Sequence, residues 1–494
     1  MIASAKRGPG STGPGPERAV IDIGSNTVRL VIYGGPRRAP IVWLNEKVTA
    51  RLGRDLAETS RMPEKATDMA LRGLSRFAAI LQDIGVADVE VVATAAVRDA
   101  ENGEEFVEAV RALGLDIRVL SGEEEATTAA WGVIGAFPGA AGTVADLGGG
   151  SLELIRIGNG ESGQGFSLPL GTLRLPALRE KGAAAFRKAI EDELVSSGWP
   201  GGQTGPLYLV GGTWRALAKF VMNAEGYPLS DPHAFRLAPA DADHFAKQAS
   251  LMSAEELAAI PGISSSRASG LADACAMLRQ LIAALQPETL VFSSWGLREG
   301  LLYRQLAPLE REKDPLLSGI EHFTRPRGVS VTQATLISGW TAAAARGGVN
   351  EDERLRMAAT MLALAASQIE PNMRLNHCTD WALHKRWLGL DHRGRAMLAA
   401  ALRGACGKPE PTAELRELAS IEDLRRAAAW GLAIRLCRRL GAGSRLSLLT
   451  SRLSREGDAL MLWIDPAREQ LRSGTVENDL KSLARWLDLD WRIE

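Results

Sequence analysis

Two stretches of the sequence share one pattern and decide the fold. The first reads AVIDIGSNT (residues 19–27), and the second reads TVADLGGGS (residues 143–151). In each, an apolar strand runs into an aspartate and then into a turn rich in glycine and hydroxyl side chains. An alternating apolar run follows each turn at once, over residues 28–33 and 152–157. This succession predicts two β-hairpins. Two phosphate-gripping hairpins that face each other would form a cleft.

Length and composition limit the class of protein. A chain of 494 residues exceeds one hydrophobic core, so about three domains are expected. Hydrophobic residues make up 46% and charged residues 24%, as in soluble globular proteins. No apolar run approaches the roughly 18 residues that cross a bilayer, and the N-terminus lacks the apolar core of a signal peptide. We therefore expect a cytoplasmic protein that needs no membrane.

The net charge and the cysteine spacing limit which ligands and cross-links are expected. The formal net charge of −1 shows no polybasic signature, so no nucleic-acid partner is expected. The four cysteines are scattered without pairwise spacing, which predicts free thiols rather than a disulfide framework or a zinc site. A polyanionic ligand would have to be met by a local site.

Strand and helix signals alternate over the first 308 residues and predict an α/β fold with two related lobes. A flexible tail (1–17) precedes lobe I (18–136) and lobe II (137–308). Lobe I has strand signals at 19–33, 41–48, 89–97 and 116–120, and helix signals at 63–84, 103–113 and 122–137. Lobe II has strand signals in its hairpin and at 206–213 and 289–293, and helix signals from Trp214 and at 265–285.

The rest of the chain has a different character. Residues 309–442 are rich in Ala, Leu and Arg and predict a mainly helical domain. Its helical runs lie at 330–346, 351–369, 393–404 and 421–440. Residues 443–494 predict a small α+β segment. Its strands are expected at 447–454, 459–464 and 490–493, with a helix at 476–487.

The second hairpin turn carries the strongest chemical signal. Gly148, Gly149 and Gly150 leave their backbone amides bare, so the amides can converge on phosphate oxygens. An ordinary flexible turn is the alternative, since glycine often marks turns. Asp146, Ser151 and Glu153 favour the functional interpretation, because their hard oxygens could together hold a hydrated Mg²⁺ that bridges phosphates.

The first turn is weaker evidence by itself. Asp22, Ser25 and Asn26 also suit an ordinary type I or I′ turn, in which Asp and Asn bond their own backbone. Paired with the second turn, the first becomes the opposing phosphate grip. Neither turn fits a Walker loop or a Rossmann glycine motif.

The segment SGEEEA (residues 121–126) lies where a strand meets a helix. Ser121 suits an N-cap, and Glu124 closes a capping box with it. Acidic residues in the first turn also favour the helix dipole, which accounts for Glu123. Glu125 has no capping role and is therefore the freest candidate for a general base.

Two arginines are candidates for phosphate contacts. Arg98 follows the strand predicted at 89–97, at the end where open α/β sheets bind ligands. Arg174 ends the segment PLGTLR (residues 169–174). A planar guanidinium suits bidentate phosphate contact. Ordinary ion pairs, such as Arg98 with Asp99 or Glu101, are the alternative.

The helical domain offers His377, Asp380, His384, Asp391 and His392. His377 and His384 lie seven residues apart and would share a helix face. Ordinary polar side chains on a helix surface explain this spacing better than a metal site does.

Together these segments resemble the exopolyphosphatase and guanosine pentaphosphate phosphohydrolase (Ppx/GppA) family of the actin-like ATPase superfamily. The resemblance rests on DIGSN (22–26), AT (93–94) with Arg98, SGEEEA (121–126), DLGGGSLE (146–153), PLGTLR (169–174) and VGGT (210–213). The segments occur in the family's order across roughly residues 18–305, and the combination is highly specific.

The resemblance implies two actin-like (ribonuclease H-like) lobes with a cleft between them. It implies that Glu125 activates the attacking water, and that Asp146 and Glu153 carry Mg²⁺ or another divalent cation. The substrate-binding set that we expect is Asp22, Ser25, Asn26, Arg98, Gly148, Gly149, Gly150, Ser151, Gly171, Arg174, Gly211, Gly212 and Thr213. Phosphoryl transfer to water needs positioning and charge stabilisation rather than a covalent intermediate.

The function that this predicts is exopolyphosphatase activity, the processive removal of terminal phosphate from inorganic polyphosphate. Hydrolysis of guanosine pentaphosphate in the stringent response is the alternative, and a polyphosphate or alarmone sensor without turnover is another. The helical domain resembles a degenerate His-Asp phosphohydrolase domain without the metal-binding dyad, so we expect it to shape a polyphosphate channel or a homodimer interface. The role of residues 443–494 is unassigned.

An actin-like ATPase or sugar kinase is the remaining enzyme rival. Such enzymes share both hairpins and the Gly211–Thr213 turn near adenosine. Trp214 follows that turn, and we hypothesise that its bulk disfavours a nucleotide base.

Overall fold

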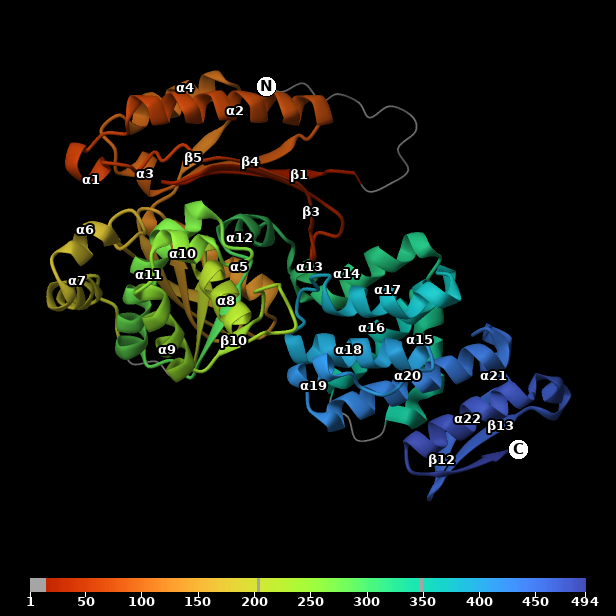
Figure 1. Cartoon of the computed structure of the whole chain (residues 1–494). Coiled ribbons are helices and arrows are strands. Elements are labelled where there is room, and N and C mark those ends of the chain that lie inside the picture. The colour runs from red at the N-terminus through yellow and green to blue at the C-terminus, as the bar shows by residue number, and fades with distance from the viewer. Residues whose placement is uncertain (1–14, 202–204, 346–349) are drawn as a thin grey trace. The chain divides into compact units, whose positions relative to one another are not determined.

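The computed structural model describes residues 15–201, 205–345 and 350–494 (Figure 1). The chain divides into two compact units, Met1–Lys313 and Asp314–Glu494. The first unit is mixed α/β, and the second is mainly helical with a small sheet. The five-part division expected from the sequence, with its boundary at residue 308, stays a prediction. Most of the expected tail, residues 1–14, lies outside the described residues.

The first unit contains a five-stranded sheet in the order β3-β2-β1-β4-β5. Its strands are β1 (Arg18–Ile23), β2 (Val28–Gly34), β3 (Ile41–Val48), β4 (Asp88–Ala93) and β5 (Ile117–Val119). The first three strands are antiparallel neighbours, whereas β4 and β5 run parallel to β1. The hairpin predicted from the first sequence stretch is thus present.

A second sheet of six strands repeats this arrangement. Its order is β10-β11-β9-β6-β7-β8. The strands are β6 (Gly142–Leu147), β7 (Leu152–Gly158), β8 (Glu161–Leu168), β9 (Pro206–Val210), β10 (Arg236–Leu237) and β11 (Thr289–Ser293). Here β6, β7 and β8 form the antiparallel part, and β9 and β11 run parallel to β6. The internal echo in the sequence therefore corresponds to two sheets with the same core order.

Helices cover both faces of the first sheet. On one face lie α2 (Glu64–Ile84) and α4 (Gly103–Ala112) (Figure 1). Helix α2 buries residues spaced three or four apart, including Ala70, Leu74, Phe77 and Leu81, and so presents one apolar stripe. On the opposite face, Leu301 and Leu302 of α12 (Leu297–Arg304) pack with strand side chains.

Helix α12 also serves the second sheet. Its Tyr303 packs in a core with β6, β7, β9 and β11 and with α5 (Gly122–Ala136). The close passage of α5 and α12 depends on glycine, because a Cβ on Gly300 would lie 1.8 Å from the Thr128 carbonyl oxygen. One short helix therefore joins the cores beneath both hairpins.

The remaining helices of the first unit were predicted in part. Helices α8 (Gly212–Ala224) and α11 (Ser265–Leu285) were expected. The additional helices are α1 (Leu56–Thr59), α3 (Ala95–Arg98), α6 (Leu175–Glu180), α7 (Ala183–Ser196), α9 (Pro239–Ser250), α10 (Ala254–Ala258) and α13 (Pro308–Glu312). By length and composition, α11 alone among the described helices could cross a membrane. It buries Leu271, Met277 and Leu278 in the fold, as a core helix does.

One strand boundary was wrong. The strand expected at 89–97 ends at Ala93, and Ala95–Arg98 form the short helix α3. The run Ala95-Ala96-Val97 is buried, and a short buried apolar run fits helix and strand equally well. Arg98 consequently ends a short helix and does not follow the strand directly.

The second unit is built on α14 (Pro315–Thr324), α15 (Val331–Trp340), α16 (Asn350–Ala365), α17 (Pro371–Leu383), α18 (His392–Ala405), α19 (Ala413–Leu418) and α20 (Ile421–Gly441). Helices α15 and α16 end in 3-10 turns, η2 (Thr341–Ala345) and η3 (Ala366–Gln368), within the ranges predicted as helix; residue 346 lies outside the described residues. Helices α18 and α20 pack backbone to backbone, since a Cβ on Gly431 would lie 1.9 Å from the Ala401 carbonyl oxygen.

A three-stranded sheet of β12 (Ser451–Glu456), β13 (Ala459–Ile464) and β14 (Asp490–Ile493) follows, with α22 (Gly474–Trp486). The first of these strands was predicted to begin at residue 447, and that was wrong. Residues Arg445–Leu449 form α21 instead, because the Ser444 hydroxyl accepts a hydrogen bond from the Ser447 amide and caps a helix.

Candidate active site

The two hairpin turns have the same backbone geometry. The Gly24 amide donates to the Thr27 carbonyl at 3.0 Å, and 124 residues later the Gly148 amide donates to the Ser151 carbonyl at the same distance. This equivalence extends to the strands. Asp22 lies opposite Arg29 across β1 and β2, and Asp146 lies opposite Glu153 across β6 and β7. Both hairpins therefore have an aspartate at this position, but the residue opposite it is positively charged in the first hairpin and negatively charged in the second.

The two turns touch each other through glycine. A Cβ on Gly149 would lie 3.0 Å from the Ser25 Cβ, and one on Gly150 would lie 2.9 Å from the Ser25 hydroxyl oxygen. Behind them, a Cβ on Gly171 would lie 2.2 Å from the Gly150 carbonyl carbon. Side chains at these positions would force the turns apart. The glycines thus allow two loops from different sheets to approach closely.

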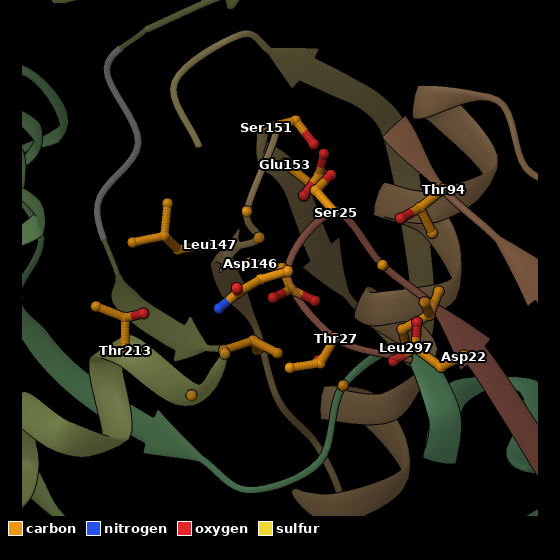
Figure 2. A pocket seen from close by; sticks show the side chains of 18 of the residues that line it. Asp22, Ser25, Thr27, Thr94, Asp146, Leu147, Ser151, Glu153, Thr213 and Leu297 are labelled. Atoms are coloured by element: carbon orange, nitrogen blue, oxygen red, sulfur yellow. The ribbon is translucent and has the colours of Figure 1, made fainter. Parts of the chain in front are cut away.

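A cleft of about 140 Å³ opens beside this contact. Figure 2 shows Ser25 and Thr27 of the first hairpin and Asp146, Ser151 and Glu153 of the second hairpin around it. All of the site residues expected from the sequence line the cleft except Arg98, Gly171 and Arg174. The turn Gly211–Thr213 contributes as well, and a Cβ on Gly211 would lie 3.3 Å from Asp146 Oδ1.

Three carboxylates, Glu125, Asp146 and Glu153, lie together in the cleft. Burial, followed by the charge of Asp22, raises the pKa of Asp146 to about 6. Glu153 is only 2% exposed, and burial together with Glu125 and Asp146 raises its pKa well above the ordinary range. Its carboxylate forms hydrogen bonds with the hydroxyl groups of Ser151 and Ser167, and Ser167 Oγ donates to Glu153 Oε1 at 3.0 Å. Crowded carboxylates of this kind favour a proton or a cation between them.

Glu125 sits on the first turn of α5, as the capping analysis predicted. The Ser121 hydroxyl accepts from the Glu124 amide, and the Glu124 carboxylate accepts from the Ser121 amide. Glu125 is left to face the cleft. It is 8% exposed, and burial raises its pKa to about 8 although Arg98 Nη1 donates to its Oε2 at 3.3 Å. A carboxyl that titrates near neutral pH suits proton transfer.

The residues present fit a hydrated divalent cation. Asp146 and Glu153 offer hard oxygen ligands side by side. Among the described residues, no Lys, Arg or His side chain forms an ion pair with Glu153. Over the described ranges, no group of three or more His, Cys, Asp or Glu side chains is arranged to hold a metal by itself. A pair of carboxylates suits Mg²⁺, which is commonly held by one or two carboxylates plus waters and substrate phosphates. The His377 and His384 spacing likewise produces no metal cluster there.

Four arginines in the cleft were missed by the sequence analysis: Arg29, Arg215, Arg267 and Arg298. Arg298 Nη1 donates to Asp22 Oδ2 at 3.1 Å. Burial, and next the charge of Arg298, lowers the pKa of Arg267. The guanidinium groups are thus crowded, which favours a bound anion. Arg29 could have been identified from the sequence, because it occupies the position in the first hairpin that Glu153 occupies in the second. The other three come from segments without a recognisable spacing.

The two arginines that were expected lie differently. Arg98 pairs with Asp99 and Glu125, the former being the ion pair weighed as its alternative role. Arg174 Nη2 lies 3.4 Å from Asp99 Oδ2 and lines a neighbouring pocket rather than the cleft. Gly171 acts behind the turn through the close contact described above. Their phosphate roles stay predictions.

The steric hypothesis about Trp214 was wrong. Its side chain is fully buried in α8 and does not line the cleft, so its bulk cannot exclude a base. Arg267 occupies the space near that turn instead, since a Cβ on Gly212 would lie 2.2 Å from the Arg267 guanidinium carbon.

Comparisons with known proteins identify relatives of this architecture. A profile described as the Ppx/GppA phosphatase family matches residues 36–308. Exopolyphosphatase 1 of Mycobacterium tuberculosis is 29% identical over 303 residues, which cover 58% of this chain and 87% of the relative. A guanosine-5′-triphosphate,3′-diphosphate pyrophosphatase of Vibrio atlanticus is 30% identical over 316 residues, covering 60% of this chain and 61% of the relative.

Among solved structures, the Aquifex aeolicus member of the Ppx/GppA family is similar. It superposes with a TM-score of 0.52 at 26% identity and covers 60% of this chain and 98% of its own. The family profile ends before the second compact unit begins.

Proposed function

The chain belongs to the Ppx/GppA phosphatase family, and from this premise we propose that it is an exopolyphosphatase that removes terminal phosphate from inorganic polyphosphate. The observation that carries the proposal is the composition of the cleft. Three carboxylates, Glu125, Asp146 and Glu153, lie in one cleft with four arginines and two amide-rich turns. A phosphoanhydride hydrolase needs these three elements: a base, a place for a cation and a grip on phosphate.

The arginines and the turn amides bind the substrate in this proposal. The amides of Gly148 to Ser151, the hydroxyl of Ser25 and the side chain of Asn26 face the terminal phosphate. Arg29 and Arg267 contact the same chain of phosphates, since a guanidinium binds phosphate in a bidentate manner. Asp22 holds Arg298 in place through their ion pair. Arg98 and Arg174 serve the next phosphates outward.

Glu125 acts as the general base. Its carboxylate accepts the proton of a water that attacks the terminal phosphorus, while Arg98 orients the carboxylate through the hydrogen bond at 3.3 Å. Asp146 and Glu153 would hold Mg²⁺ or another divalent cation, which supplies charge neutralisation at the phosphate oxygens when bound. No covalent enzyme intermediate is required.

Guanosine pentaphosphate hydrolysis is a second candidate. Its support is the Vibrio relative, which has about the same identity to this chain as the mycobacterial exopolyphosphatase. Both substrates present a terminal phosphoanhydride to the same cleft. The second compact unit leads us to favour the longer polymer, because an added domain offers surface for a long chain. We also propose a cytoplasmic homodimer with actin-like lobes, in which the second unit is a degenerate His-Asp phosphohydrolase-like domain.

One preparation can decide between the candidates. Phosphate release with Mg²⁺ is measured from long-chain polyphosphate, guanosine pentaphosphate and ATP in parallel. We expect the highest kcat/KM for polyphosphate and the lowest for ATP. A higher value for guanosine pentaphosphate would select the second candidate, and a higher value for ATP would favour the kinase-like rival.

The mechanism is tested by two neighbouring substitutions. Glu125→Gln should lower kcat by about 10²- to 10⁴-fold, the usual contribution of a general base, and leave polyphosphate binding intact. Glu124→Gln is the matched control, because glutamine still closes the capping box and should leave kcat unchanged. Full activity of Glu125→Gln would refute the assigned base, and binding without turnover by the parent protein would identify a sensor.

A further inference from the structure

A second charged pocket lies entirely within the Asp314–Glu494 unit. It has a volume of about 600 Å³ and is lined by the ends of several helices. Five arginines line it: Arg327, Arg374, Arg435, Arg438 and Arg439. Among the residues that the structure describes, its lining contains no Asp, Glu, Lys or His and no aromatic side chain. We refer to it as the arginine pocket.

Carboxylates neutralise this pocket only in part. Asp479, behind the lining, pairs with Arg435 at 3.0 Å and with Arg439 at 2.6 Å. Within the described part of the chain, no ion pair involves Arg327, Arg374 or Arg438. Five guanidinium groups therefore share one carboxylate, which leaves a surplus of four positive charges around the pocket.

Helix capping explains some of the arginines but does not cancel their charge. Arg327 donates to the Phe323 carbonyl at 2.6 Å, Arg374 to the Ile369 carbonyl at 2.9 Å and Arg438 to the Ala363 carbonyl at 3.5 Å. These carbonyls lie near the C-terminal ends of helices. The dipole of a whole helix places only about half a negative charge at such an end, which is too little to cancel a guanidinium charge. Each guanidinium has five N–H donors, and these carbonyl contacts use only one nitrogen of each. Like charges packed this closely favour a multiply charged anion.

A cysteine thiol also lines the pocket. Cys406 lines the pocket at the end of α18, and the buried Cys378 of α17 is its hydrogen-bond partner. That hydrogen bond, followed by the charges of Arg374, Arg438 and Arg435, lowers the pKa of Cys406 to about 7. The arginine charges among these causes also favour a phosphate oxygen, whereas the Cys378 hydrogen bond concerns the thiol alone.

We propose that the arginine pocket binds a compact phosphoanhydride, an inorganic di- or triphosphate, and holds it without hydrolysing it. Planar guanidinium groups match phosphate geometry, and several of them suit adjacent phosphates. The described lining residues include no carboxylate to act as a base or to hold a metal, so the ligand is retained rather than cleaved. The absence of aromatic side chains from the lining favours an inorganic anion over a nucleotide, whose base would need a stacking partner. This site is separate from the cleft of the first unit.

The test uses Cys406 as the reporter in the full chain. Alkylation by iodoacetamide is followed by peptide mass spectrometry at pH 7 in a chelator, which prevents metal-dependent hydrolysis. Inorganic tripolyphosphate should slow Cys406 alkylation at least about fivefold, because a bound phosphate covers the thiolate and raises its pKa. Sodium chloride at matched ionic strength should have no such effect. Equal slowing by both salts would overturn the proposal.

Variants assign the effect to the pocket. Arg374→Gln and Arg438→Gln should each reduce the protection by tripolyphosphate at least about fivefold, since each removes a charge-assisted contact. Every variant is compared with its own ligand-free rate, because losing an arginine also changes thiol reactivity. Arg445→Gln, at an exposed arginine of α21, is the matched control and should protect like the parent. Thermal unfolding verifies that each variant is folded.

Two further arms identify the source of the phosphate. Guanosine tetraphosphate, which carries the same diphosphate chemistry on a nucleoside, should protect less than inorganic tripolyphosphate. Stronger protection by the nucleotide would overturn the assignment to an inorganic anion. Retained protection in both Arg374→Gln and Arg438→Gln would place the ligand elsewhere. The parent's hydrolytic activity does not enter these readouts, so they stand apart from the proposed function.

Discussion

Asp146 and Glu153 face each other directly across β6 and β7 in the lining of the cleft, where Glu153 is buried and Asp146 is half-buried. Directly opposed residues on antiparallel strands have Cβ atoms about 4.5–5.5 Å apart, and like charges there oppose folding. The equivalent pair in the first hairpin, Asp22 and Arg29, has opposite charges. The opposed carboxylates of the second hairpin therefore destabilise the metal-free fold at the position where we propose a cation.

Replacing Glu153 should separate stability from function. Burial and its neighbours raise the folded-state pKa of Glu153 above the ordinary 4.5, so ionisation favours the unfolded chain as pH rises. In metal-free protein, Glu153→Gln should therefore raise the unfolding free energy by about 1 kcal/mol or more at pH 8, with the gain shrinking toward pH 5. Chemical denaturation in a chelator measures this.

The same variant should lose Mg²⁺-dependent phosphate release. Glu161→Gln, at an exposed glutamate of β8, is the control and should change neither quantity. A metal-free Glu153→Gln protein that is less stable than the parent at every pH would contradict the argument about opposed carboxylates.

Arg267 should act in substrate binding. Its guanidinium lies against Gly212 at the cleft, where burial and Arg298 lower its pKa. Arg267→Gln should raise KM for polyphosphate by about 10-fold or more, the value of a charge-assisted hydrogen bond, with a smaller change in kcat. Steady-state phosphate release measures both constants. Arg236→Gln, at an exposed arginine of β10, should leave KM unchanged, and an unchanged KM in Arg267→Gln would count against the phosphate grip.

Gly171 should tolerate no side chain. A Cβ there would lie 2.2 Å from the Gly150 carbonyl carbon and 2.3 Å from the Ser151 amide nitrogen, both of which are backbone atoms. Gly171→Ala should displace the second turn, cost about 1–3 kcal/mol of stability and lower kcat/KM by about 10-fold or more. Thermal unfolding and phosphate release test this. Gly158→Ala meets only the Ala141 Cβ at 4.0 Å and should resemble the parent.

Asp423 should stabilise the second unit above its low pKa. Arg393 donates to both carboxylate oxygens at 2.8 Å, and this hydrogen bonding chiefly lowers the pKa of Asp423 to about 2. A folded-state pKa below the unfolded 3.8 adds stability at neutral pH, and that stability is lost as pH falls toward 2.

Asp423→Asn should therefore lower the unfolding free energy at pH 7 by about 1–3 kcal/mol, the usual worth of charged hydrogen bonds. The difference should vanish as the pH falls from about 5 to about 2. Glu422→Gln, at an adjacent glutamate whose side chain is 87% exposed, should change little. A deficit in Asp423→Asn that persists at pH 2 would contradict the assigned cause.

Local features were predictable because their causes lie within a few residues. The hairpins follow from alternation and turn residues, and the structure places both where the sequence did. Ser121 and Glu124 form the predicted capping box, since both partners lie three residues apart. The strand expected to reach Val97 and the strand expected from Ser447 were wrong at those ends, because short apolar runs fit two conformations and a single cap can decide between them.

The sequence by itself determined the two hairpin turns and the freedom of Glu125 from capping, because backbone geometry and helix capping are local. Tertiary structure alone decided which charges meet there. Arg267 and Arg298 reach the cleft from helices far along the chain, while Arg174 turns to Asp99. Long guanidinium side chains take partners by proximity in space, and no sequence spacing encodes that. The arginine pocket arises in the same way, from helix ends that only packing brings together.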